Sequence, residues 1–201
     1  MRTHKTGRPS ADGVVVGPAK PADVDYVRTL SKRVFHQYGP YEEMVTRWFE
    51  SGATETHLAL TQKRPAGFVM LGSLERQFYL PVVSEVLAIA VEPASWECGI
   101  GHLLMKELQK RAVQLEVETL VLHTATENIP GQRLFSKCGF VPCQIKKAFY
   151  PAGQDALMMF KDLFFTGAEM CVTGTTWDMQ LSPKTSASAY KGNCLKDTRE
   201  T

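Results

Sequence analysis

A short apolar strand that passes through a glycine turn into a helix is the feature that most limits how this 201-residue chain can fold. Residues 84–91 form an apolar run that is too short for a helix, so we predict a central strand there. Beyond the turn, apolar residues recur at helical spacing at Leu104, Leu108, Ala112 and Leu115. A helix that begins at such a turn exposes backbone N–H groups without intrahelical partners, and its dipole attracts anions. Gly99 and Gly101 therefore indicate either an anion-binding turn or a plain tight connection.

Strand-like and helix-like patterns alternate along the rest of the chain. Helices are predicted at residues 24–38, 42–50 and 131–137. Strands are predicted at residues 14–16, 57–61, 67–74, 119–123, 140–147 and 156–163, with a turn at residues 63–66. The last helix is expected to start only at Gly131, because Pro130 precedes it. This order mixes antiparallel hairpins with crossover connections, so we predict an α+β fold.

Composition indicates one globular domain with a modest extension. The chain is 44% hydrophobic and 22% charged, and its net charge of +2 argues against a nucleic-acid surface and against strong attraction to acidic membranes. No apolar run reaches the ~20 residues that span a bilayer, and none follows the N-terminus as in a signal peptide. We predict a flexible segment at residues 1–12, a domain at 13–163 and an extension at 164–201 that is largely disordered from residue 182.

The cysteines give no sign of a metal centre or a disulfide framework. There are five, at positions 98, 138, 143, 171 and 194, an odd number without the Cys-x-x-Cys spacing of a zinc site. Reduced thiols are the better interpretation. The sequence therefore predicts a cytoplasmic protein that needs no metal.

Three motifs follow one another at residues 91–101, 128–140 and 149–159. The first consists of Val91, Pro93, Gly99 and Gly101. The second consists of Asn128, Leu134, Phe135, Gly139 and Phe140. The third consists of Phe149, Tyr150, Pro151, Gln154, Asp155, Ala156 and Met159. Together they resemble the GNAT superfamily of acyl-CoA-dependent N-acyltransferases, and the third is similar to the ending of RimI-type protein N-terminal acetyltransferases. Residues 14–75 fit this family in outline only.

The resemblance implies the GNAT fold, a mixed and mostly antiparallel sheet flanked by helices, and transfer of the acetyl group of acetyl-CoA to a primary amine. The acceptor is then a protein or peptide N-terminus or a small-molecule amine, and the protein a monomer or homodimer that binds neither nucleic acid nor membrane. Backbone groups of the central strand and of the glycine turn are expected to hold the thioester and the pyrophosphate. The residues expected to contact acetyl-CoA are Ile89, Ala90, Val91, Glu97, Cys98, Gly99, Ile100, Gly101, His102, Asn128 and Phe135.

Direct attack by an amine requires a base near the thioester, because only the neutral amine is nucleophilic. His123 ends a predicted strand, and histidine has the ordinary pKa best suited to base catalysis at neutral pH. Glu85 begins the central strand, and a glutamate at the matching position is the base in the histone-acetylating branch of the family. Tyr150 is a candidate proton donor or acceptor-site residue. The alternatives are a surface glutamate, a backbone-bonded histidine and an aromatic residue at the sheet edge.

Two positions depart from the family pattern. Trp96 stands where the first motif has Arg or Gln, which removes one side-chain contact to the pyrophosphate. Phe135 stands where many members have a tyrosine that protonates the departing thiolate. These departures leave open an alternative function, a catalytically silent acyl-CoA-binding module that acts as a sensor.

Overall fold

The computed structural model of the chain describes residues 13–72 and 82–164. All of them belong to one compact unit, Met1–Phe165. The predictions for residues 1–12, for the end of the strand at 67–74 and for the chain beyond 164 lie outside the described residues. No helix in the described part is long and apolar enough to cross a membrane.

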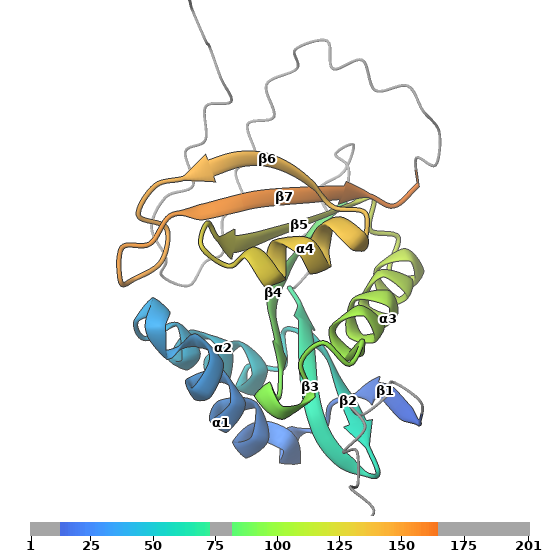
Figure 1. Cartoon of the computed structure of the whole chain (residues 1–201). Coiled ribbons are helices and arrows are strands. Elements are labelled where there is room, and N and C mark those ends of the chain that lie inside the picture. Colours follow the sequence, from blue (N-terminus) through green and yellow to red (C-terminus); the bar gives the residue numbers. More distant parts are fainter. Residues whose placement is uncertain (1–12, 73–81, 165–201) are drawn as a thin grey trace, which may run out of the picture. The chain divides into compact units, whose positions relative to one another are not determined.

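Seven strands form a single sheet in the order β1-β2-β3-β4-β5-β7-β6 (Figure 1). They are β1 (Val14–Pro18), β2 (Glu55–Thr61), β3 (Arg64–Leu71), β4 (Val83–Val91), β5 (Thr119–Ala125), β6 (Val141–Lys146) and β7 (Ala156–Asp162). Neighbouring strands are antiparallel except for β4 and β5, which are parallel. The predicted α+β class and the mixed, mostly antiparallel sheet are thereby confirmed.

Four α-helices and three short 3-10 helices cover the sheet within the described residues. They are η1 (Pro21–Asp23), α1 (Val24–Phe35), η2 (His36–Tyr38), α2 (Tyr41–Glu50), η3 (Pro93–Ser95), α3 (Ile100–Gln114) and α4 (Ile129–Lys137). One core cluster joins Val27 and Leu30 of α1 to Phe68 of β3, and another joins Leu104 and Leu108 of α3 to other strand residues. Apolar residues at helical spacing thus face the sheet from α1 and α3, as the pattern predicts.

The hairpin between β2 and β3 is tighter than predicted. The turn consists of Gln62 and Lys63, with φ angles of 50° and 65°, and β3 already begins at Arg64. Two left-handed residues make the turn that best matches the twist of the flanking strands. The predicted turn at residues 63–66 was therefore wrong, because Pro65 lies inside a strand and does not mark a loop.

Helix α4 begins earlier than predicted and ends where expected. It starts at Ile129, because the Asn128 side chain accepts a hydrogen bond from Gly131 N at 3.1 Å and caps the helix. Pro130 fits the first turn, where no N–H is needed. Beyond its end, Gly139 has a φ of 89°, the left-handed conformation that glycine adopts readily after a helix. The predicted start at Gly131 was wrong because Pro130 was treated only as a helix breaker.

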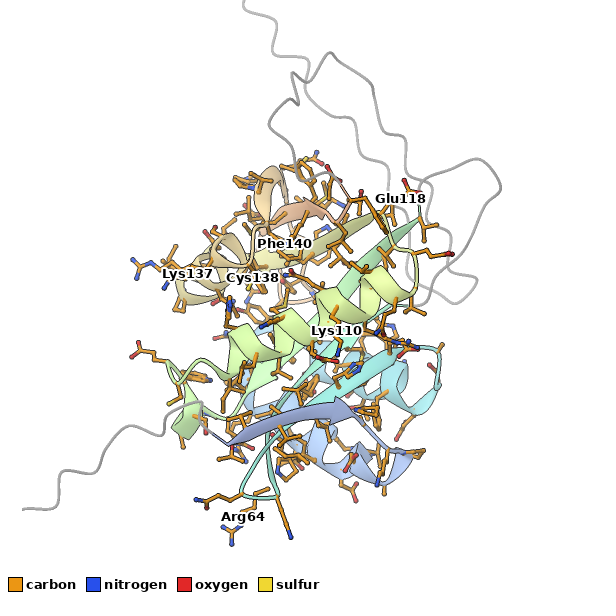
Figure 2. The ribbon with its side chains drawn as sticks, turned by 90° about the vertical axis from the view of Figure 1, so that its right-hand side faces the viewer. Arg64, Lys110, Glu118, Lys137, Cys138 and Phe140 are labelled. Carbon is orange, nitrogen blue, oxygen red and sulfur yellow. The ribbon has the colours of Figure 1, made fainter. Side chains whose placement is uncertain are left out.

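The segment that follows α4 packs against α3. Cys138 and Phe140 lie beside this helix (Figure 2) and belong to its core cluster. The side chains of Gln109 and Lys161 both donate hydrogen bonds to the Cys138 carbonyl, at 3.2 and 2.8 Å. These contacts tie α4 to α3 and to β7.

The parallel pair β4 and β5 separates halfway along its length. Residues 83–86 pair with residues 119–122, and no pairing continues beyond them. On the other side of β4, the register against β3 shifts between Met70 and Leu71, which leaves Leu87 as an extra, bulged residue. Residues 87–91 of β4 therefore have an open edge that faces the end of β5.

Candidate functional site

The two candidate bases, His123 and Glu85, contact each other where β4 and β5 separate. The parallel register places Glu85 beside Val121, so that Glu85 and His123 lie on the same face of the sheet. His123 Nδ1 lies 2.7 Å from Glu85 Oε1, and the histidine side chain is only 6% exposed. An ionised carboxylate only accepts hydrogen bonds, so Nδ1 carries the proton of this contact, and Nε2 is the nitrogen that carries the lone pair when the imidazole is neutral. The imidazole also stacks on Phe149, with ring centroids 4.5 Å apart.

A cavity of about 60 Å³ lies at this separation. Five of the residues singled out from the sequence contribute to its lining: Ile89, His123, Asn128, Phe135 and Tyr150. The rest of the lining is Phe35, Tyr38, Tyr41, Val86, Leu87, Ala88, Leu122, Thr124 and Ala125. The structure thus gathers residues from the second and third sequence motifs, from β4 and β5 and from the N-terminal helices around one cavity, whereas no residue of the first motif lines it.

Three tyrosines form one wall of the cavity, and the sequence indicated only Tyr150. The Tyr38 and Tyr150 rings stack at 4.6 Å, and the Tyr41 ring meets Tyr150 edge-on at 5.5 Å. Tyr150 is 6% exposed, and its hydroxyl points to the His123 carbonyl at 3.4 Å. Burial raises the pKa of Tyr38, so its phenol stays protonated well above neutral pH. The wall therefore presents neutral hydroxyl groups beside the histidine.

Contacts between two loops hold the tyrosine wall together. Ala152 N donates to the Tyr38 carbonyl at 3.3 Å, and Gln154 Nε2 donates to the Gln37 carbonyl at 2.7 Å. Gly39 has a φ of 82°, and a Cβ there would lie 3.0 Å from Pro151 Cβ. Glycine therefore permits this close approach. In the sequence the same residue indicated only the end of a helix, so Tyr38 and Tyr41 were missed.

The first turn of α3 lies at the glycine turn for which the sequence predicts anion binding. Gly99 caps the helix with a φ of 83°, and the first intrahelical bond runs from Leu103 N to the Gly99 carbonyl at 3.1 Å. The N–H groups of Ile100, Gly101 and His102 consequently have no acceptor within the helix. Their dipoles add to that of the helix and favour an anion at this end.

The side chains around this turn do not line the cavity. Cys98 donates to the Trp96 carbonyl at 3.2 Å, and Glu97 has a φ of 60°. The exposed His102 places Nδ1 3.4 Å from Cys138 Sγ. A Cβ on Gly101 would lie 3.0 Å from a methyl group of Leu134, so this glycine also sets the approach of α3 to α4.

Asn128 links the cavity to helix α4. Besides capping the helix through Oδ1, its Nδ2 donates to Thr124 Oγ1 at 3.1 Å. A Cβ on Gly131 would lie 2.4 Å from Asn128 Nδ2, which is too close for this arrangement to survive. Glycine at 131 is therefore required by the asparagine and not by the helix.

Only every second residue of β4 directs its backbone N–H and C=O groups toward the open edge. Glu92 N donates to the Ala66 carbonyl on β3 at 2.9 Å. Because hydrogen-bonded positions alternate in an antiparallel pair, Ala90 also directs its backbone groups toward β3. Ile89 and Val91 direct theirs toward the open side. Three residues were predicted to orient a thioester through their backbone N–H groups. Those of Ile89 and Val91 point toward the open side, whereas that of Ala90 points toward β3.

No group of three or more His, Cys, Asp or Glu side chains that could hold a metal ion lies among residues 13–72 and 82–164. What the cavity region offers is one hydrogen-bonded base, backbone N–H groups on an open strand edge and neutral phenols. Such an arrangement can accept a proton and can polarise a carbonyl oxygen.

Comparisons with known proteins identify the family to which the chain belongs. The sequence profile of the acetyltransferase (GNAT) family matches residues 24–140, more than half of the chain. An uncharacterized protein of Mycobacterium leprae is 28% identical over 152 residues, which cover 74% of this chain and 41% of that protein. The chain thus spans about two fifths of the length of this curated relative.

Solved structures of acetyltransferases share the fold. The ribosomal-protein-S18-alanine N-acetyltransferase of Escherichia coli is 18% identical, with a TM-score of 0.64 over 78% of this chain and 98% of that one. NAA60 of Arabidopsis thaliana, in complex with acetyl-CoA, is 17% identical, with a TM-score of 0.65 over 75% and 98%. The ribosomal-protein-alanine N-acetyltransferase of Brucella melitensis is 20% identical, with a TM-score of 0.63 over 74% and 99%. The resemblance inferred from the motifs is confirmed, and the chain belongs to the acetyltransferase (GNAT) family.

Proposed function

We propose that this protein transfers the acetyl group of acetyl-CoA to a primary amine, with His123 as the general base. The observation that carries the proposal is the 2.7 Å contact between His123 Nδ1 and Glu85 Oε1 beside the cavity. Glu85 orients the imidazole and stabilises the cation that forms when Nε2 takes a proton. The two residues that the sequence offered as alternative bases thereby take complementary roles.

Acetyl-CoA is proposed to lie between the separated ends of β4 and β5. The N–H groups of Ile89 and Val91 would bind the thioester carbonyl and the amides of the pantetheine arm. The pyrophosphate would meet backbone N–H groups of residues 97–102, among them those of Ile100, Gly101 and His102 at the start of α3. Asn128 and Phe135 border the cavity on the side of α4. Fixed N–H dipoles of this kind stabilise the oxyanion that develops during acyl transfer.

The reaction is direct. The amine nitrogen attacks the thioester carbon and the C–N bond forms, while Nε2 of His123 accepts the proton that nitrogen loses. The C–S bond then breaks, and the sulfur leaves with its electron pair as the CoA thiolate. Phe135 has no hydroxyl to protonate it, so the proposed donor is Tyr150, a buried phenol that borders the same cavity. The products are an N-acetyl amide and CoA.

The acceptor proposed is the α-amine of a peptide. An α-amine has an ordinary pKa of ~8 and is partly neutral at physiological pH, whereas a lysine side chain has a pKa of ~10.4 and needs a stronger base. A single histidine base is therefore better suited to deprotonating an α-amine than a lysine side chain. The third sequence motif favours the same acceptor class, and a small-molecule amine is the alternative. The cytoplasmic location and the monomeric or homodimeric state stay predictions.

The test is release of the CoA thiol from acetyl-CoA in the presence of a panel of acceptors. Peptides with different first residues are compared with the same peptides blocked at the N-terminus but carrying a lysine, with a polyamine and with free amino acids. We expect release with unblocked peptides, and loss of release in His123→Ala. Binding of CoA without thiol release for any amine would favour the silent sensor module instead.

A further inference from the structure

Two of the carbonyl groups on the open edge of β4 accept hydrogen bonds from side chains. Leu87 O accepts a hydrogen bond from the Tyr41 hydroxyl at 2.7 Å. Val91 O accepts one from the indole Nε1 of Trp96, also at 2.7 Å. Both carbonyls point to the side where β5 no longer pairs with β4. Two aromatic side chains thus satisfy acceptors that a neighbouring strand would otherwise take.

The two aromatic side chains that bond these carbonyls differ in how firmly the surrounding structure holds them. Tyr41 belongs to α2 and packs edge-on against Phe35 and Trp48, with ring centroids 5.5 and 6.0 Å away. The Trp96 side chain is 57% exposed and lies in the turn before α3. Its indole can leave the Val91 carbonyl without opening the core, whereas Tyr41 cannot leave Leu87 in that way.

We infer that Trp96 competes with acyl-CoA for the carbonyl of Val91, an inference that rests on the proposed function. The pantetheine arm contains two secondary amides, and a chain with amides binds an open strand edge by pairing N–H with C=O. On this edge the last carbonyl of β4 is already occupied by the indole N–H. The arm pairs fully only after Trp96 swings outward, so part of the gross binding energy is lost in breaking the bond.

The effect on affinity has a definite sign. A hydrogen bond in water has a modest net value, and removing this competitor is expected to tighten binding of CoA about 2- to 10-fold. An Arg or Gln at position 96, as in the family pattern, would add an attraction to the pyrophosphate. Trp96 instead weakens the hold on CoA, so the product leaves more readily after transfer.

Calorimetric titration with CoA tests the competition on the full chain. Trp96→Phe keeps an aromatic ring without an N–H, and Trp96→Leu removes both. We expect both variants to bind CoA about 2- to 10-fold more tightly than the wild type. Trp48→Phe is the matched control, because Trp48 does not line the cavity, and its CoA affinity should equal that of the wild type.

Three other results would overturn the inference. If Trp96→Leu binds more weakly while Trp96→Phe equals the wild type, the ring is a stacking surface for the cofactor. If neither variant differs from the wild type, Trp96 has no role in binding. If the wild-type protein does not bind CoA at all, the proposed function fails, and the inference fails with it.

The indole proton gives a second readout that does not depend on activity. The chain has three tryptophans, and the Trp96→Phe variant identifies the indole N–H resonance of Trp96 by its absence. We expect this resonance to move upfield as CoA saturates the protein, because the indole loses its carbonyl acceptor. An unchanged resonance at saturation would show that the cofactor binds without displacing it.

Discussion

His123 Nδ1 and Glu85 Oε1 lie 2.7 Å apart, although 38 positions separate the two residues in the chain. The contact exists because β4 and β5 are the one parallel pair among the described strands, which brings Glu85 level with Val121, two residues before His123 on the same face. Beyond this level the strands separate and the cavity begins. The base is thus placed by the same topology that creates the site.

His123→Ala should lower kcat by ~10²–10⁴, the usual effect of removing a general base. Glu85→Gln should cost less, because an amide oxygen still accepts the Nδ1 proton. The double variant His123→Ala/Glu85→Ala should be no slower than His123→Ala, because the two residues act as one unit. Steady-state kinetics on the best peptide acceptor measure all three. An inactive Glu85→Gln beside a nearly normal His123→Ala would transfer the base role to Glu85.

Tyr150→Phe should slow transfer if its phenol protonates the departing thiolate. The loss should lie at the lower end of the ~10²–10⁴ range for acid–base catalysis, because a thiolate leaves readily. Phe135 borders the same cavity, so Tyr150→Phe/Phe135→Tyr should recover part of the rate. Tyr38→Phe, which also removes a hydroxyl from the wall, serves as the control. Equal losses in Tyr38→Phe and Tyr150→Phe would indicate a shared packing role.

Asn128 and Gly131 should be coupled in stability. Asn128→Ala removes the helix cap and should cost about 0.5–2 kcal/mol. Gly131→Ala should also destabilise the protein, because its Cβ would lie 2.4 Å from Asn128 Nδ2. In the Asn128→Ala background that obstacle is gone, so the same change should stabilise the helix by up to about 1 kcal/mol. Chemical denaturation of the wild type, the two single variants and the double variant measures this double-mutant cycle. The same sign in both backgrounds would contradict the coupling.

The sequence predicted most of the elements and their order, because apolar periodicity and glycine turns are local signals. It placed the turn between β2 and β3 and the start of α4 wrongly, since both depend on how Pro65 and Pro130 are used in context. It also offered Glu85 and His123 as alternatives. Only the strand register shows that they touch, and register is a property of the whole sheet.

The tyrosine wall could not be predicted for a related reason. Tyr38 and Tyr41 lie more than a hundred residues from Tyr150, and no spacing rule connects them. They meet because Gly39 lets one loop approach another closely, which becomes visible only when both loops are in place. The glycine turn before α3, by contrast, was predicted with its correct helix because strand, turn and helix are consecutive.

His57 should make the stability of the fold depend on pH. It is 7% exposed, and burial lowers its pKa below the ordinary 6.5, with Glu107, Glu55, Arg111 and Lys110 as the charged neighbours. In the unfolded chain the imidazole takes up a proton as the pH falls through about 6.5, whereas the buried ring resists it. The contribution of His57 to stability is therefore complete above that pH and is lost progressively below it.

His57→Gln should remove this dependence, because the amide is polar and similar in size but does not titrate. Thermal midpoints measured at intervals from pH 7.5 to 5.5 should decline more steeply in the wild type than in the variant. The pKa of Glu55 is lowered by its hydrogen bonds from Arg111, so that carboxylate titrates below this window and affects both proteins alike. Other histidines are common to the two proteins, so the difference in slope isolates His57. Parallel slopes would mean that His57 binds its proton equally well in the folded and unfolded chains.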